Sequence, residues 1–381
     1  MGGQDFQRTM PGAQVHFSRR RTWWSYTHLD PILTLLLLIL AGYGLFVFYS
    51  ASGQSEAAVQ RQLIRYGVAF GAMLVIACTS PRLLRRWAPW VFGLGVLMLV
   101  GVLLFGVGAK GAQRWLQLPG LPRFQPSEIM KLVVPMTLAW YFADRPLPPR
   151  LKHTFTVLAI LMLPTLLIAK QPDLGTSLLI AASGIFVLLL SGVLWRYVFS
   201  AIVLAGACVP LLWMLMRDYQ KQRVLTFLNP ESDPLGAGWN IIQSKTAIGS
   251  GGIHGKGWLN GSQSQLDFLP ESHTDFIIAV MAEELGLVGV LLLLAIYLCI
   301  IARGLWIASQ AQDTFGRLLA GSLTLTFFVY VFVNIGMVSG ILPVVGVPLP
   351  LVSYGGTSIL TLMAGFGMIM SIHSHRTMVT R

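Results

Sequence analysis

The sequence predicts an all-α, polytopic integral membrane protein with about ten transmembrane helices. Of its 381 residues, 55% are hydrophobic and only 11% are charged, whereas a soluble domain has about 25% charged residues. Apolar runs of roughly the 20 residues that cross a bilayer recur along the whole chain. The runs are uniformly apolar rather than alternating, so they favour helices over membrane strands.

The apolar runs place the expected spans in order along the chain. We expect them at about 31–49, 62–79, 88–107, 127–142, 155–169, 175–192, 197–216, 274–301, 317–338 and 357–373. Asp30 and Pro31 suit the cap and first turn of the first helix. The eighth run is long enough that its helix must tilt or extend beyond the bilayer.

The same runs predict how the chain is divided. We expect a cytoplasmic N-terminal tail (1–30), a ten-helix transmembrane domain (31–373) and a cytoplasmic C-terminal tail (374–381). The longest segment without a span, 217–273, should be an outward loop. Arginines in short loops, such as Arg82, Arg85 and Arg86, set this orientation, with both termini in the cytoplasm.

The net charge of +12 does not indicate nucleic acid, because the Lys and Arg residues are spread over many short loops. The outward face nevertheless has more cations than the orientation rule predicts. Long loops are exempt from that rule, and this exemption explains Arg217 and Arg223. It does not explain Lys110 and Arg114, because the loops that hold them are short. Cations near the membrane indicate an anionic substrate group, such as a lipid pyrophosphate.

The most informative stretch is Phe268–Val280, which places Glu271, His273 and Asp275 directly before the long eighth span. A charged side chain costs a few kcal/mol in the hydrocarbon, so an acidic residue at the mouth of a span is a functional candidate. Glu283 lies two turns deeper on the same helix. A proton relay with Asp275 is one interpretation, and a structural ion pair is the one we favour.

Three further charged residues are candidates for a structural or a functional role. Glu128 and Lys131 are three residues apart, so they share a helix face and can pair. Such a pair either neutralises two costly charges or holds a polar cavity open. Asp173, in a tight outward turn, is expected to cap the sixth span.

Two segments outside the regular spans are unusual. Residues 243–257 begin with Gln243 and Ser244 and have five glycines in the last nine positions; they form either a flexible loop or a backbone cradle for an anion. Residues 339–356 contain three prolines, which rule out a regular helix. We interpret the latter as a re-entrant loop that floors a lipid-accessible groove.

These blocks together resemble the SEDS family (shape, elongation, division and sporulation). The matching pieces occur in the family's order over nearly the whole chain: Arg114–Leu116, Gln125–Lys131, Gln171–Thr176, Ala247–Gly252, Leu269–Ile277, Ala282–Gly286 and Leu342–Gly356. The resemblance implies a GT-C-like fold with ten spans. It also implies a peptidoglycan glycosyltransferase in the bacterial cytoplasmic (inner) membrane. Such an enzyme is an inverting hexosyltransferase that polymerises lipid II at the outer face of this membrane during elongation and cell-shape maintenance.

The resemblance assigns Asp275 the catalytic role, as the base that takes a proton from the GlcNAc 4-hydroxyl of the acceptor. The donor in this reaction is a glycan linked to undecaprenyl pyrophosphate. Contacts to substrate are expected from residues on the outward loops and in the fourth span: Lys110, Arg114, Glu128, Lys131, Arg217, Arg223, Gln243 and Ser244. A divalent cation, Mg²⁺ or Mn²⁺, is expected as helper, and the sequence leaves open whether Asp275 is the base or its ligand.

The family also implies partners: a class B penicillin-binding protein with transpeptidase activity and other membrane proteins of the elongation machinery. Two other functions stay open. A lipid II flippase would need charges at the midplane and repeat symmetry, and a scaffold for the transpeptidase would have no use for Asp275. The division-specific paralogue shares the same motifs.

Overall fold

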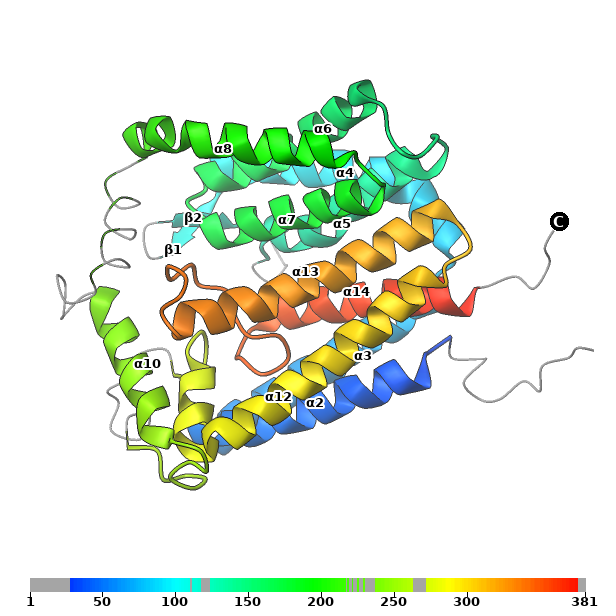
Figure 1. The fold of residues 1–381 in the computed structure, drawn as a ribbon. Coiled ribbons are helices and arrows are strands. Elements are labelled where there is room, and N and C mark those ends of the chain that lie inside the picture. The colour runs from blue at the N-terminus through cyan, green and yellow to red at the C-terminus, as the bar shows by residue number, and fades with distance from the viewer. Residues whose placement is uncertain are drawn as a thin grey trace, which may run out of the picture.

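A computed structural model describes residues 28–109, 112–117, 124–216, 218, 221, 225, 229, 237–262 and 272–375. The described chain is a bundle of long helices that run roughly between two opposite ends (Figure 1). The helices are α2 (Pro31–Ala51), α3 (Glu56–Ala77), α4 (Pro81–Phe105), α5 (Pro126–Ala143), α6 (Leu151–Lys170), α7 (Leu174–Leu190), α8 (Trp195–Leu215), α10 (Ala237–Gly251), α12 (Ile277–Ser309), α13 (Thr314–Val338) and α14 (Gly356–Ser374).

Each predicted span is occupied by one of these helices, so the all-α, polytopic prediction is confirmed. By length and composition, six helices of the described chain can cross a membrane: α2, α4, α6, α12, α13 and α14. α7 is shorter, at 17 residues, which is the lower limit of about 17 for a spanning helix. α3 and α5 carry charged residues within their length.

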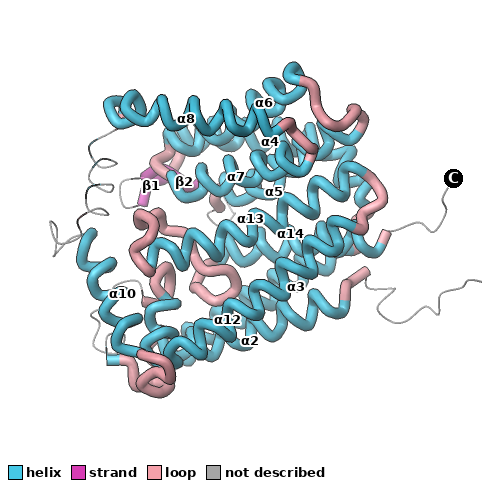
Figure 2. The backbone as a smooth tube through the Cα atoms, viewed as in Figure 1, coloured by secondary structure: helices cyan, strands magenta, loops and turns pink. Residues whose placement is uncertain are grey.

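The two ends of the bundle differ. At one end α2 begins and α14 finishes, and His28 lies 3.1 Å from the Ser374 hydroxyl; we call this the termini end. The opposite end carries α10, a small sheet and the turn before α12 (Figures 1 and 2), and we call it the site end. The two described chain ends therefore lie on one side of the bundle.

Helix starts follow the predicted caps in part. The Asp30 carboxylate accepts a hydrogen bond from the Leu33 amide at 2.8 Å, and Asp173 accepts one from the Thr176 amide at 3.3 Å. Both aspartates therefore cap their helices as expected. α5 begins at Pro126, whose fixed φ suits the first turn, so Ser127 lies inside the helix and does not cap it.

A short antiparallel sheet at the site end was not expected from the sequence. β1 (Val107–Ala109) pairs with β2 (Ala112–Trp115), and Leu116 makes an isolated bridge with Phe124. These strands are three and four residues long, too short for a visible alternation of polar and apolar residues. The hairpin lies outside the spans and leaves the all-α class of the bundle unchanged.

The predicted outward loop contains α10, and its glycines pack against a break in α12. Gly286 has φ 66° and ψ −164° inside α12, a backbone conformation that favours glycine. A Cβ on Gly255 would lie 2.1 Å from the Glu284 carbonyl oxygen, and one on Gly251 would lie 1.9 Å from that of Ala282. These glycines permit close backbone packing, so neither the flexible-loop nor the anion-cradle interpretation describes them.

Residues 339–355 form the predicted irregular segment between α13 and α14. Helical structure is absent from this described stretch, and it folds back against the bundle, where Val347, Leu349 and Leu351 are buried. Two tyrosines satisfy its carbonyls: Tyr66 donates to Leu351 at 2.6 Å and Tyr297 to Pro350 at 2.7 Å. Buried irregular backbone is stable when its polar groups are paired in this way.

Candidate functional site

The candidate site is built around Asp275, in the turn that immediately precedes α12. Asp275 is a partly exposed residue, while the next residue, Phe276, is buried. Asn334 of α13 fixes the backbone of this turn: its side-chain amide donates to the carbonyl of Asp275 at 3.0 Å and to that of Val347 at 2.7 Å. One buried amide therefore ties the Asp275 turn to the irregular segment 339–355.

The same segment makes further contacts with the turn. The Tyr354 amide donates to the His273 carbonyl at 3.0 Å, and the Ser353 hydroxyl donates to the Thr274 carbonyl. Gly346 faces the carboxylate, because a Cβ at this glycine would lie 3.5 Å from Asp275 Oδ2. The acidic side chain thus projects from a turn whose backbone is held at several consecutive carbonyls, which limits its movement.

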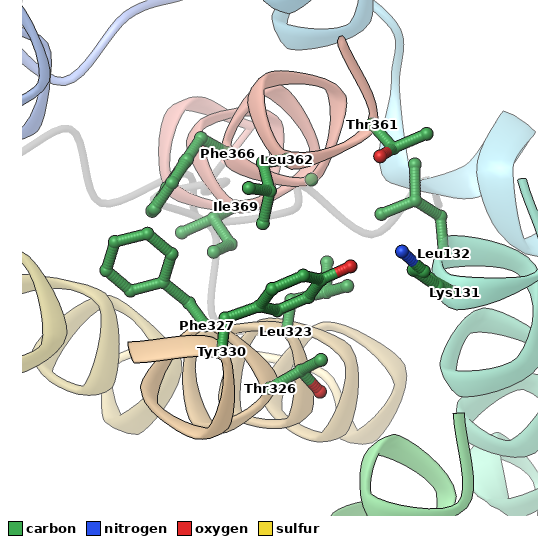
Figure 3. A pocket seen from close by; sticks show the side chains of 11 residues that line it. Lys131, Leu132, Leu323, Thr326, Phe327, Tyr330, Thr361, Leu362, Phe366 and Ile369 are labelled. Atoms are coloured by element: carbon green, nitrogen blue, oxygen red, sulfur yellow. The ribbon is translucent and has the colours of Figure 1, made fainter. Parts of the chain in front are cut away.

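Glu128 and Lys131 form the predicted ion pair inside the bundle. Lys131 Nζ lies 2.6 Å from Glu128 Oε1, and the Thr361 hydroxyl donates to Glu128 Oε2 at 3.0 Å. The ammonium also lies 5.1 Å from the centre of the Tyr330 ring, as Figure 3 illustrates. The pairing prediction is confirmed, with partners supplied by α5, α13 and α14.

The cavity beside this pair is small. Its volume is about 30 Å³, enough for roughly one or two waters, and most of its lining side chains are apolar (Figure 3). Lys131 and Glu128 are both buried. In this conformation the pair joins three helices, and the cavity that the described residues form beside it is too small for a sugar or a pyrophosphate.

Arg114 belongs to a polar corner at the site end. Its guanidinium donates to the Pro172 carbonyl and lies 3.9 Å from Asp173 Oδ1, while the Gln125 amide donates to Asp173 Oδ2 at 2.8 Å. The corner packs against the Asp275 side of the molecule, because a Cβ on Gly175 would lie 2.7 Å from the Val345 carbonyl. The turn that Arg114 contacts therefore leads directly into a residue, Gly175, that packs on the segment 339–355.

The remaining predicted contacts are placed differently. The Ser244 side chain is fully buried, and its hydroxyl donates to the Val338 carbonyl at 2.9 Å, so it fastens α10 to α13 and has no open path to a substrate. Gln243 is half-buried on the same helix. Lys110, Arg217 and Arg223 lie outside the described residues.

Glu283 is ion-paired, as we favoured. Its Oε1 lies 2.6 Å from Lys256 Nζ and accepts from the Ser262 hydroxyl at 2.9 Å, and its side chain has no exposed surface. The neighbouring Glu284 accepts from Ser50 at 2.5 Å. Both carboxylates hold the 251–262 segment and α2 against the break in α12, which is a structural role.

Sequence reasoning missed Asn334, Ser353 and Gly346 as supports of the site. A signal existed for Asn334, since an amide within the apolar run 317–338 is costly unless it is paired. Nothing local marked Ser353 or Gly346, because their importance depends on contact with a turn about 70 residues away in sequence.

A divalent cation can be tested against the residues present. Within the described ranges, three or more His, Cys, Asp or Glu side chains do not converge on a metal position. Mg²⁺ at phosphate-transfer sites commonly uses one or two carboxylates together with substrate phosphates. The partly exposed carboxylate of Asp275 fits that smaller requirement.

The fold and the site together define a polytopic membrane protein with a fixed acidic residue at one end of its bundle. The profile of the FtsW, RodA and SpoVE family, described as cell cycle proteins, matches residues 31–378. The chain therefore belongs to this family, as its motifs suggested.

Individual relatives cover almost the whole chain. Peptidoglycan glycosyltransferase MrdB of Escherichia coli K12 is 58% identical over 363 residues, covering 95% of this chain and 98% of the relative. A probable peptidoglycan glycosyltransferase FtsW of Trichlorobacter lovleyi is 37% identical, covering 90% and 92%. Sequence identity thus favours the MrdB type over the FtsW type.

Solved structures share the fold. A chain of a peptidoglycan synthase complex, described as coordinating polymerization and crosslinking, superposes with a TM-score of 0.81 and 29% identity, covering 92% of this chain and 99% of that one. The rod shape determining protein RodA of Thermus thermophilus gives a TM-score of 0.69 with 27% identity, covering 91% and 96%.

Proposed function

We propose that this protein is a peptidoglycan glycosyltransferase that polymerises lipid II, with Asp275 as its catalytic residue. The observation that carries the proposal is the placement of this carboxylate: partly exposed, next to Gly346, on a turn fixed by Asn334 and Ser353. A base must keep its position relative to the proton that it accepts. The high identity to MrdB favours a role in cell elongation and shape over one in division.

The reaction joins two lipid-linked sugars. Asp275 takes the proton of the acceptor GlcNAc 4-hydroxyl, and the oxygen forms a bond with the anomeric carbon of the donor, with inversion. The bond from that carbon to the phosphate oxygen breaks, and its electron pair leaves with undecaprenyl pyrophosphate. The proton then passes from Asp275 to solvent or to the released pyrophosphate.

The leaving pyrophosphate needs cationic stabilisation. Arg114 is the described candidate, because it is about one-third exposed and contacts the turn before Gly175, which packs on the segment 339–355. Lys110, Arg217 and Arg223 stay as predictions. Lys131 is buried in its pair with Glu128, so we assign it a structural role in this conformation. If a divalent cation is used, Asp275 would hold it and the ion would neutralise phosphate charge.

We further infer that the site end faces outward and that both termini are cytoplasmic, since the arginine-rich short loops belong to the termini end. Association with a class B penicillin-binding protein is supported by the likeness to a chain of a synthase complex described as coordinating polymerization and crosslinking. A flippase is less favoured, because two buried carboxylates of the described helices, Glu128 and Glu283, are held in close ion pairs.

The test is polymerisation of lipid II by the purified protein in complex with its partner. Asp275→Ala and Asp275→Asn should reduce the initial rate by about 10²- to 10⁴-fold, the usual contribution of a general base. Asp144→Asn, which removes an exposed carboxylate at the surface, is the control and should keep the wild-type rate. Polymer formation by Asp275→Asn at the wild-type rate would contradict the proposal, and loss of polymer with an intact complex would exclude a mere scaffold.

A further inference from the structure

A polar pocket of about 590 Å³ lies at the site end, between the end of α2, the start of α3 and the Asp275 turn. Its volume is within the range of about 300–1,000 Å³ that is typical of ligand pockets. The side chains that could bind a ligand include Ser52, Gln54, Ser55, Arg61, His273 and Tyr354. Hydroxyl, amide, guanidinium and aromatic groups in one cavity are the groups that bind a sugar with an anionic substituent.

The pocket adjoins the proposed catalytic residue. His273, which lines it, is two residues before Asp275, so the two Cα atoms are at most about 7.6 Å apart, twice the spacing of about 3.8 Å between neighbours. This is roughly the length of one sugar ring. A sugar bound in the pocket can therefore bring a terminal hydroxyl to the carboxylate.

Three side chains that line the pocket are held by neighbouring residues. Tyr354 is held by Arg65, whose guanidinium lies 3.9 Å from the centre of the ring and donates to the tyrosine hydroxyl at 2.7 Å. Phe48 stacks near the same ring, with centroids 5.7 Å apart. Ser50 is held by its hydrogen bond to Glu284. A preformed cavity of this kind lowers the entropic cost of binding.

The lipid of a membrane-bound substrate has a path beside this pocket. Arg61 is exposed at the first turns of α3, and Ile64 and Val68 follow it at three and seven residues, on the same helix face. Both apolar side chains are 61% exposed. A cation above an apolar stripe matches a phosphate above a hydrocarbon chain.

We propose that this pocket is the acceptor subsite, which binds the sugar of the incoming lipid II while Arg61 contacts its pyrophosphate. This inference rests on the proposed function. The acceptor keeps its pyrophosphate throughout the reaction, so an anchoring cation is sufficient for it. The donor loses its pyrophosphate, and we assign it to the Arg114 corner, which is formed by residues outside this pocket.

The experiment separates the two substrates kinetically, using the full chain in complex with its partner. A preformed lipid-linked tetrasaccharide serves as donor and lipid II as acceptor, each varied at saturating levels of the other. Arg61→Gln should raise the KM for lipid II about tenfold and change the KM for the tetrasaccharide less than twofold. Lys245→Gln removes an equal charge from an exposed position on α10, outside the pocket, and should leave both values unchanged.

Other outcomes would overturn the assignment. An unchanged KM for lipid II, equal changes for both substrates, or a change for the donor alone each exclude an acceptor subsite here. If Arg61→Gln does not fold, Gln54→Cys gives a second measurement. Lipid II should slow the modification of this thiol by a maleimide at least threefold, with the unsubstituted chain as the background. Absence of protection would also exclude the subsite.

Failure of this inference can be told apart from failure of the proposed function. If Asp275→Asn polymerises normally, the catalytic assignment is wrong. If Asp275→Asn is inactive but Arg61→Gln behaves as wild type, only the acceptor subsite is wrong.

Discussion

Two acidic residues, Asp275 and Glu283, lie about two turns apart at the head of α12, and their surroundings differ. Asp275, just before the helix, is partly exposed, and protein atoms hold its backbone carbonyl. Glu283, inside the helix, has no exposed side-chain surface and is held directly at its carboxylate by Lys256 and Ser262. A carboxylate that exchanges a proton needs a fixed backbone and a side chain that reaches solvent, whereas a structural carboxylate is buried and paired. Asp275 meets the first description and Glu283 the second.

The largest expected effect concerns the ion pair of Lys256 and Glu283, because removing one partner should cost more stability than removing the other. Lys256→Met leaves the carboxylate of Glu283 buried without its cation, and we expect a loss of about 3 kcal/mol in stability. Glu283→Gln should cost only about 1 kcal/mol, because Lys256 is 32% exposed and its ammonium can turn toward solvent. Thermal unfolding in detergent measures both. Equal losses would show that burial does not decide the outcome.

The next effect concerns the backbone support of Asp275. Asn334→Ala removes the donor to the carbonyls of Asp275 and Val347. We expect kcat to fall about tenfold, with KM changed less than threefold. An unpaired buried polar group costs about 1–3 kcal/mol, and about 1.36 kcal/mol corresponds to a tenfold change in rate. Thr326→Val is the matched control on α13, because that hydroxyl bonds within its own helix. Equal losses of activity in the two variants would contradict a positioning role for Asn334.

A smaller effect is expected at Gly346. This residue has φ 71°, so an alanine would add strain of roughly 1–2 kcal/mol, which relaxes most readily by moving the backbone next to the Asp275 carboxylate. We expect Gly346→Ala to lower the polymerisation rate about threefold. Gly340→Ala has a similar φ of 75° but faces the flexible Lys245 side chain, so it should lower stability without this loss of rate.

The smallest effect concerns a third carboxylate, Asp30 at the termini end. Burial opposes its ionisation, but hydrogen bonds from Arg303 and the Leu33 amide, with the charges of Arg303 and His373, lower the pKa of Asp30 below its usual value. The stabilisation is therefore fully present above the unfolded pKa of about 3.9 and is lost as the pH falls through the lower folded pKa. Below about pH 4, the Tm of the wild type should decrease with falling pH more steeply than the Tm of Asp30→Asn. Parallel curves for the two proteins would show that the ion pair of Asp30 and Arg303 does not contribute to stability.

Much of the fold was predictable because its signals are local. Each apolar run is long enough to require a helix, and the caps Asp30 and Asp173 use hydrogen bonds within one turn. The Glu128–Lys131 pair was also predictable, since three residues on a helix place two side chains on one face. For the same reason Asp275 could be located at the head of α12.

The partners of these residues were not predictable, because they come from distant segments. Lys256 reaches Glu283 only because the glycines of 251–257 pack against the break at Gly286. The sequence showed the glycines and the acidic residue but not their contact, so the glycine-rich stretch was misinterpreted. Ser244 was misplaced for the same reason: its burial depends on how α10 lies on α13.

The sequence by itself determined the membrane class, the order of the apolar helices and the acidic residue at the head of α12, because apolar runs in lipid must satisfy their backbone groups as helices. Only the tertiary structure decided which charged residues are available for chemistry. Burial, pairing and exposure of a side chain depend on the helices and loops that meet around it, and residues 60 to 80 positions away supply those neighbours for Asp275.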